Sequence, residues 1–171
     1  MTIKRITKNI VLIGLMGSGK TMISRALAKR LRVERFSTDE QVELKEKCSV
    51  AEIVAAKGWP YFREVEREIV KTLASKKGVI IDCGGGVVLD AENFDILRKN
   101  GIIFHLDANP EVLYQRLKGD QSRPLISGPT PKARIKEIYE ERLPLYNQAD
   151  FTLDASDPSI EGPIVEILKK V

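Results

Sequence analysis

The sequence has few of the residues that mark secreted, membrane-spanning or thiolate-metal proteins. Only two of its 171 residues are cysteine, Cys48 and Cys83, and they lack CxxC spacing. A disulfide framework or a thiolate metal site is therefore a poor interpretation, and a reducing compartment fits best. The chain also lacks an apolar run near the roughly 20 residues that span a bilayer, and a signal-peptide segment. We expect a cytoplasmic protein that does not bind membranes.

The chain also lacks a large excess of one charge and any interleaving of aromatic with basic residues, which argues against binding to nucleic acid. The chain has 28 Lys and Arg against 24 Asp and Glu, for a net charge of +4, and a single Trp. Basic residues alternate with acidic ones everywhere except between Arg116 and Arg134, so we expect no continuous basic surface. A small anionic ligand is the better expectation, with no nucleic acid partner.

What is present indicates one globular domain. Hydrophobic residues make up 43% of the chain and charged residues 30%, which argues against disorder or a coiled coil. Short apolar runs alternate with helical patterns, such as the stripe of Ile23, Leu27 and Leu31. This alternation predicts an α/β fold around a mostly parallel sheet. The expected strands are Ile10–Ile13, Arg35–Ser37, Val79–Asp82, Ile102–Leu106 and Phe151–Leu153.

Local signals also predict where several helices begin. Ser49 followed by Glu52 is a capping-box pattern. In this pattern the side chain of each residue accepts a hydrogen bond from the backbone N–H of the other. Asn109 followed by Pro110 places a capping residue before a proline in the first helical turn. We therefore expect helices to start at these two positions.

The strongest motif is a phosphate-binding loop pattern from Gly14 to Thr21. It reads G-x-x-x-x-G-K-[ST] and follows the first predicted strand, as this motif requires. Its glycines let backbone N–H groups turn toward phosphate oxygens, and the helix beginning near Lys20 adds its positive dipole end. Lys20 is expected to reach the β and γ phosphates, and the Thr21 hydroxyl to bind Mg²⁺. The expected nucleotide contacts in this segment are Gly17, Ser18, Gly19, Lys20, Thr21 and Met22.

Motifs along nearly the whole chain resemble those of the shikimate kinase family, in the same order. They are the Gly14–Thr21 loop, Thr38-Asp39, Phe62-Arg63, Gly84-Gly85-Gly86, Arg123-Pro124-Leu125 and Arg142-x-Pro144-Leu145-Tyr146. The resemblance implies a three-layer α/β/α P-loop NTPase fold with a five-stranded parallel sheet and a lid loop, as one domain over residues 1–171. It also implies a monomeric enzyme that uses ATP and Mg²⁺ to phosphorylate the 3-hydroxyl of shikimate, on the route to chorismate and the aromatic amino acids.

The resemblance further implies an acceptor-binding region at about residues 38–66. Asp39 corresponds to the family's acid that contacts the acceptor hydroxyl, where a carboxylate can take the hydroxyl proton. Arg63 and Arg142 correspond to the pair that binds the shikimate carboxylate, which planar guanidinium groups suit. The glycine triplet 84–86 leaves room for a ligand near backbone N–H groups. Local sequence alone fits equally well a helix start at Asp39, and it favours solvated helix charges at the two arginines.

A lid is expected at about residues 117–131, in a segment rich in Gly, Pro and Ser that has no core pattern. By the resemblance, Arg123 reaches over the phosphates and stabilises the charge that develops during transfer. Arg116 corresponds to a residue that covers the adenine, and Pro158 lines the other side of the base. Local sequence alone also fits an exposed charge at a helix end for Arg116.

The metal side of the site departs from the family pattern. Family members carry an acid two residues before the acceptor-binding acid, where this chain has Ser37. Asp82 stands two residues before the glycine triplet, where the family often has a small hydroxyl residue. Our hypothesis is that the carboxylate has moved across the site, so that Asp82 lies in the outer shell of Mg²⁺ and Ser37 is its neutral partner. Alternatively, Asp82 only caps the strand end.

Two other functions stay open. One is a kinase of another small hydroxylated metabolite, such as gluconate. The other is a nucleotide-sensing module without catalysis, which the serine at position 37 suggests. Preferential phosphorylation of a different acceptor would favour the first, and tight ATP binding without any product would favour the second.

Overall fold

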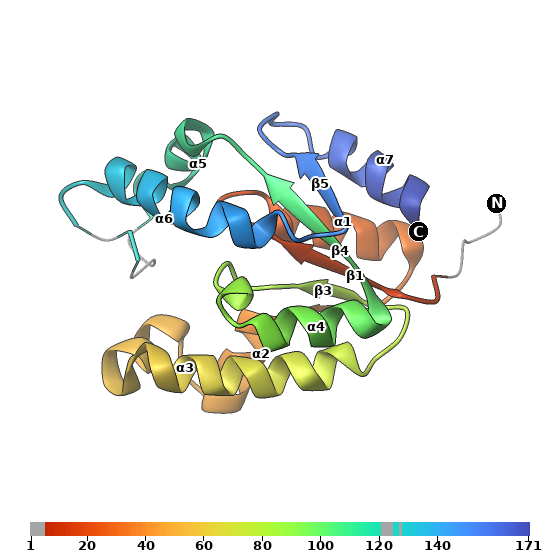
Figure 1. Ribbon diagram of the computed structural model, residues 1–171, viewed down its shortest axis with the longest axis horizontal. Helices are drawn as coiled ribbons and strands as arrows, with labels where there is room; N and C mark the ends of the chain where they lie inside the picture. Colours follow the sequence, from red (N-terminus) through yellow and green to blue (C-terminus); the bar gives the residue numbers. More distant parts are fainter. Residues whose placement is uncertain (1–5, 121–124, 127) are drawn as a thin grey trace.

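The computed structural model describes residues 6–120, 125–126 and 128–171, which form a central sheet with helices on both faces (Figure 1). All neighbouring strands are parallel, in the order β2-β3-β1-β4-β5. The predicted α/β fold with a five-stranded parallel sheet is confirmed. The strands are β1 (Asn9–Ile13), β2 (Arg35–Ser37), β3 (Ile80–Asp82), β4 (Gly101–Asp107) and β5 (Phe151–Asp154).

All five predicted strands are present, and their ends differ from the prediction by one residue at most. The start of β1 shows the cause of such a one-residue difference. The Asn9 side chain donates to the Lys76 carbonyl at 2.8 Å and accepts from the Val79 N–H at 3.2 Å, so a polar residue is satisfied inside the sheet. Val79 bonds this side chain, and β3 begins one residue later, at Ile80. These partners lie far from Asn9 in the sequence, which shows no local sign of them.

Two helical layers cover the sheet, because successive strand residues point to opposite faces. Ile10 and Leu12 pack with α1 and α7, whereas Val11 and Ile13 pack with helices α3 to α6 on the other face (Figure 1). In the described part of the chain, no helix combines the length and hydrophobicity of a membrane span. The helices are α1 (Lys20–Leu31), α2 (Thr38–Glu46), α3 (Val50–Ala74), α4 (Ala91–Asn100), α5 (Pro110–Leu117), α6 (Pro131–Tyr146) and α7 (Glu161–Lys170), with a short 3₁₀ helix, η1 (Val87–Leu89).

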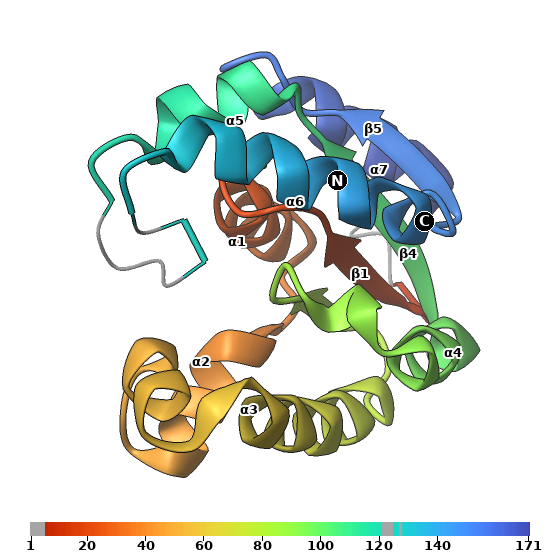
Figure 2. The same ribbon diagram turned by 60° about the vertical axis from the view of Figure 1, so that its left-hand side comes forward.

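The helix α2 and the first half of α3 stand away from the sheet and have a small core of their own (Figure 2). Val42 of α2 packs there against Ile53 of α3. The predicted capping box of Ser49 and Glu52 starts α3. The helix bends at Gly58, whose φ of 81° is in the left-handed region that glycine adopts most easily. The predicted acceptor-binding region is therefore a lobe next to the sheet.

The predicted lid corresponds to the connection between α5 and α6. Its proposed catalytic residue, Arg123, lies outside the described residues. Two described residues of this connection do make contacts: Ile126 is buried in the core under α5 and α6, and Leu125 packs beside it.

Candidate active site

The Gly14–Thr21 loop connects β1 to α1, as the motif predicts. Gly17 and Gly19 have φ values of 81° and 90°, in the region where side chains other than glycine are strained. The helix α1 begins directly after Gly19, so the unpaired N–H groups of its first turn are available beside the loop. This is the arrangement of a site for phosphate oxygens.

The Lys20 side chain folds back over this loop. Its Nζ donates to the carbonyls of Gly14 at 2.7 Å and Leu15 at 3.0 Å, and it lies 3.4 Å from the Ser18 hydroxyl. Lys20 is only 9% exposed. These contacts hold the ammonium group against the loop, so phosphate oxygens bound by the loop would lie near a fixed positive charge.

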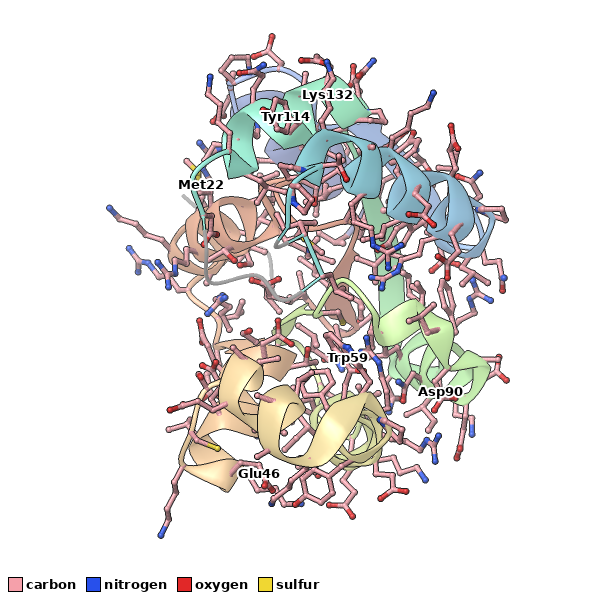
Figure 3. All side chains as sticks on the ribbon, turned by 90° about the vertical axis from the view of Figure 1, so that its left-hand side faces the viewer. Met22, Glu46, Trp59, Asp90, Tyr114 and Lys132 are labelled. Carbon is pink, nitrogen blue, oxygen red and sulfur yellow. The ribbon has the colours of Figure 1, made fainter. Side chains whose placement is uncertain are left out.

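A cavity of about 640 Å³ lies against the loop and reaches the carboxyl ends of β2 and β3. Its size is in the range of small-molecule sites. Met22 stands at the exposed side of α1, near the edge of the molecule in Figure 3. The predicted nucleotide-binding residues that line the cavity are Gly17, Ser18, Gly19, Lys20, Thr21, Met22, Arg116 and Pro158.

A second cavity, of about 360 Å³, lies between the α2–α3 lobe and the sheet. Trp59, the single Trp of the chain, forms part of its wall and faces the space between the lobe and the rest of the molecule in Figure 3. The predicted acceptor-binding residues that line this cavity are Asp39, Arg63, Gly84, Gly85, Gly86 and Arg142.

Asp39 lines both cavities, together with Met16, Gly84 and Gly85. It occupies the first turn of α2, immediately after β2. The two interpretations of Asp39 from the sequence, a helix start and an acceptor-binding acid, are therefore compatible. The helix start is what carries the carboxylate to the point where the cavities meet.

The two arginines come from helices far apart in the sequence and meet in the second cavity. Nη1 of Arg63 lies 2.6 Å from Oε2 of Glu66, and its guanidinium carbon lies 5.3 Å from the centre of the Trp59 ring. Arg142 is 5% exposed, and its Nε and Nη1 have no hydrogen-bond partner among the described residues. Because buried N–H groups without partners are costly, this guanidinium suits an anionic ligand.

Comparison with known proteins identifies the family. The model of the shikimate kinase family matches residues 16–171. The shikimate kinase of Thermodesulfovibrio yellowstonii is 41% identical over 163 residues, which cover 95% of this chain and 94% of that protein. The chain belongs to the shikimate kinase family. The shikimate kinase of Caldanaerobacter subterraneus is similarly related, with 43% identity over 162 residues, 95% of each chain.

A solved shikimate kinase has the same fold. The enzyme from Acinetobacter baumannii, in complex with shikimate, superposes with a TM-score of 0.93 and 30% identity, over 97% of this chain and 93% of that one. The three-layer P-loop fold implied by the family resemblance is thus confirmed.

In this shikimate kinase family member, two glycines of the triplet leave room for neighbouring side chains of the same protein. A Cβ at Gly84 would lie 2.5 Å from Oδ1 of Asp39, and a Cβ at Gly86 would lie 2.0 Å from Nη2 of Arg63. Both distances are shorter than real Cβ contacts. The missing side chains at Gly84 and Gly86 thus leave room for Asp39 and Arg63, and all three glycines line the second cavity. Contact of the triplet with a ligand stays a prediction.

We expect Gly84→Ala to lower kcat for phosphoryl transfer by roughly 100-fold, because displacing a catalytic group by about 1 Å has effects of that size. Stability should change little, since the displaced atom ends a flexible side chain. The matched control is Gly162→Ala in α7, where a Cβ meets nothing within 4 Å. Steady-state kinetics with both variants tests this; equal kcat values would show that the close approach to Asp39 is unimportant.

Glu66, which lies one helical turn after Arg63, was not predicted as a site residue. It is 1% exposed, lines the second cavity, and its Oε1 has no hydrogen-bond partner among the described residues. Burial raises the pKa of Glu66 to about 7, although the charge of Arg63 opposes this shift. The signal in the sequence was an acid on the buried side of a helix, at i+3 from the predicted acceptor-binding Arg63.

Glu66 makes stability depend on pH. Its folded-state pKa is above the usual value of 4.5, so the folded protein keeps a proton that the unfolded chain releases. Stability from this group is complete below pH 4.5 and is lost as the pH rises to about 7, by at most about 3 kcal/mol. We expect Glu66→Gln to gain stability relative to the parent between pH 5 and pH 8 in urea unfolding. A stability difference that stays constant over this range would contradict the prediction.

On the metal side, Thr21 and Asp82 supply oxygen donors to the first cavity. Asp82 ends β3 beside β1, where its register partner is Leu12, and it is also the register partner of Ser37 on β2. The hypothesis that a carboxylate moved between these two positions therefore concerns neighbouring strands, about 4.8 Å apart. Ser37 caps α2, because its hydroxyl accepts from the Glu40 N–H at 3.4 Å.

Arg116 connects the phosphate-binding loop to the segment before α7. Its guanidinium donates to the carbonyls of Gly17, Ser156 and Asp157, each at 3.1 Å. Arg116 and Pro158 both line the first cavity, and neither lines the second. Contacts of both residues with adenine stay a prediction.

Tyr146, at the end of α6, contacts the glycine triplet. Its hydroxyl donates to the Gly85 carbonyl, and its ring stacks on His105 with centroids 4.9 Å apart. Burial raises the pKa of Tyr146 to about 12 and lowers that of His105 to about 4. Both rings are therefore neutral packing elements near pH 7, and they hold the triplet in place.

Proposed function

We propose that this protein transfers the γ-phosphoryl group of ATP to the 3-hydroxyl of shikimate, on the route to chorismate and the aromatic amino acids. The observation that carries the proposal is the position of Asp39, where a cavity built on a phosphate-binding loop meets one that contains two arginines. Membership of the shikimate kinase family supports the same substrates.

The proposed step is a direct transfer. The bond from the γ-phosphorus to the β–γ bridging oxygen breaks, a bond to the shikimate oxygen forms, and the hydroxyl proton passes to Asp39. Lys20 compensates charge on the β and γ phosphates, and Arg123 has the same role from the lid. The products are ADP and shikimate 3-phosphate.

Magnesium fits the donors present, because it prefers oxygen ligands and is held in kinases by few protein groups plus phosphates. The Thr21 hydroxyl would bind the ion and Asp82 would hold its water shell, with Ser37 as the weaker neighbour. When bound with ATP, the ion compensates charge on the phosphate oxygens. We extend the proposal to a single-domain, monomeric, cytoplasmic enzyme, with an acceptor-binding region at about residues 38–66 and a lid at about 117–131, as the resemblance implies.

A coupled ADP-release assay with shikimate, quinate and gluconate, side by side, tests the proposal. We expect kcat/KM to be highest for shikimate by roughly 100-fold, because a site built to hydrogen-bond a given set of hydroxyls discriminates strongly. Gluconate also carries a carboxylate, so the arginine pair alone does not separate these acceptors. A higher value for gluconate would support the alternative metabolite kinase, and ATP binding without any product would support the sensing module.

A further inference from the structure

Arg35, a residue of β2 that the family motifs do not include, connects the metal side of the first cavity to its neighbours. Its Nη2 lies 2.7 Å from Oδ2 of Asp82, and its Nε donates to the Ser24 hydroxyl at 2.9 Å. Its Nη1 donates to both carboxylate oxygens of Glu40, at 3.0 and 2.9 Å. The Arg35 side chain is only 11% exposed. One guanidinium thus joins β3, α1 and α2 at the carboxyl ends of the central strands.

We propose that Arg35 is a positioning residue that holds the Asp82 carboxylate toward the Mg²⁺ of the bound nucleotide. This inference rests on the proposed function, and within it on the metal role of Asp82. The partner that holds this carboxylate has a rigid fork of donors, of which Nη2 contacts Oδ2 of Asp82.

The contacts on Asp82 support a role in orientation. Arg35 and the Ser24 hydroxyl, which lies 3.2 Å away, both contact Oδ2, and neither contacts Oδ1. The Asp82 side chain is 5% exposed and lines the cavity next to Thr21. Fixing one oxygen of a carboxylate fixes the direction of the other, so Oδ1 is the oxygen left for a water molecule on the metal.

Ser24 links the same group to the proposed metal ligand. Its hydroxyl lies 3.0 Å from the carbonyl oxygen of Thr21, one turn earlier in α1, and Ser24 is fully buried. Glu40 has a second partner in this cluster, because Nη2 of Arg25 lies 3.8 Å from its Oε1. Asp82 therefore belongs to a paired cluster on the metal side, and Arg35 sets where its carboxylate points.

The test measures the affinity for ADP by calorimetry, once with and once without Mg²⁺. The ratio of the two affinities, the Mg²⁺ enhancement, reports on metal coordination and does not depend on turnover. We expect Arg35→Met to lower this Mg²⁺ enhancement about 10-fold or more, as loss of outer-shell partners of metals does. Affinity for ADP without Mg²⁺ should change less than about twofold, because the loop contacts remain. Arg35→Lys, which keeps the charge without the fork, should recover only part of the loss.

A double-mutant cycle separates positioning from a merely structural role. In Asp82→Asn protein, adding Arg35→Met should lower the enhancement no further, because the residue on which Arg35 acts is already changed. The double variant also avoids the buried unpaired carboxylate that makes the single variant unstable. Additive losses in the cycle would overturn the proposal. The matched control is Arg67→Met, which removes another arginine–aspartate pair of 2.6 Å, with Asp90, outside the nucleotide cavity.

Failure of this inference and failure of the proposed function give different results. If Asp82→Asn leaves the Mg²⁺ enhancement intact, Asp82 has no metal role and the inference is wrong, whatever the protein phosphorylates. If shikimate is not phosphorylated but both single variants lose the enhancement, the inference stands and the acceptor is wrong.

Discussion

Replacing Asp39 with asparagine is expected to lower kcat for shikimate phosphorylation by roughly 100- to 10,000-fold, the usual contribution of a proton-accepting side chain. Asparagine has nearly the same shape but cannot take the hydroxyl proton. Asp39 lies in the first turn of α2 and the cap is Ser37, so the helix should form as before. Steady-state kinetics with ATP and shikimate measures the effect.

ATP binding provides the control for this variant. The phosphate-binding loop and Lys20 are built on β1 and α1, and Asp39 belongs to neither element. We therefore expect the dissociation constant of ATP to change less than about threefold, well under the effect of one charged hydrogen bond. A large loss of ATP affinity, with kcat unchanged at saturation, would show instead that Asp39 shapes the nucleotide site and takes no part in proton transfer.

Replacing Arg142 with methionine is expected to weaken shikimate binding by roughly 10- to 100-fold, which corresponds to one or two charged hydrogen bonds. Nε and Nη1 of Arg142 have no partners among the described residues, so the substitution removes ligand contacts more than internal ones. The free energy of unfolding without ligand should therefore stay the same or increase. Quenching of the single Trp, Trp59, which lines the same cavity, gives a direct titration.

Arg142→Lys is the matched variant for this prediction. Lysine keeps the charge but has no planar fork, so we expect an intermediate affinity for shikimate. The KM for ATP should be unchanged in both variants, because Arg142 does not line the nucleotide cavity. Unfolding at lower urea concentration, with normal shikimate affinity, would assign Arg142 a structural role.

Features defined by neighbouring residues were predictable. The loop from Gly14 to Thr21 was found because its geometry depends on glycines and on the strand and helix on either side. The Ser49–Glu52 cap and the five strands were found for the same reason, since their signals lie within a few residues. The assignment of Asp39, Arg63 and Arg142 came from family resemblance, because from local sequence helix charges at the surface were the favoured interpretation of the arginines.

The features that were missed depend on partners distant in the sequence. Asp82 was predicted to supply the carboxylate of the metal side, but its pairing with Arg35, 47 positions earlier, was not predicted. Neither residue signals the other locally. Glu66 was passed over because a helix carries many acids, and only packing of the α2–α3 lobe against the glycine triplet buries this one.

By itself, the sequence determined the phosphate-binding loop, the order of strands and helices along the chain, and the family. The tertiary structure decided which charges meet: two arginines in one cavity, a carboxylate between two cavities, and a guanidinium on the acid at the metal side. The physical reason is the distance along the sequence over which each kind of interaction acts. Backbone conformation follows from sterics and hydrogen bonds between near neighbours, whereas the strength of a charge depends on burial and on partners that only the folded chain brings together.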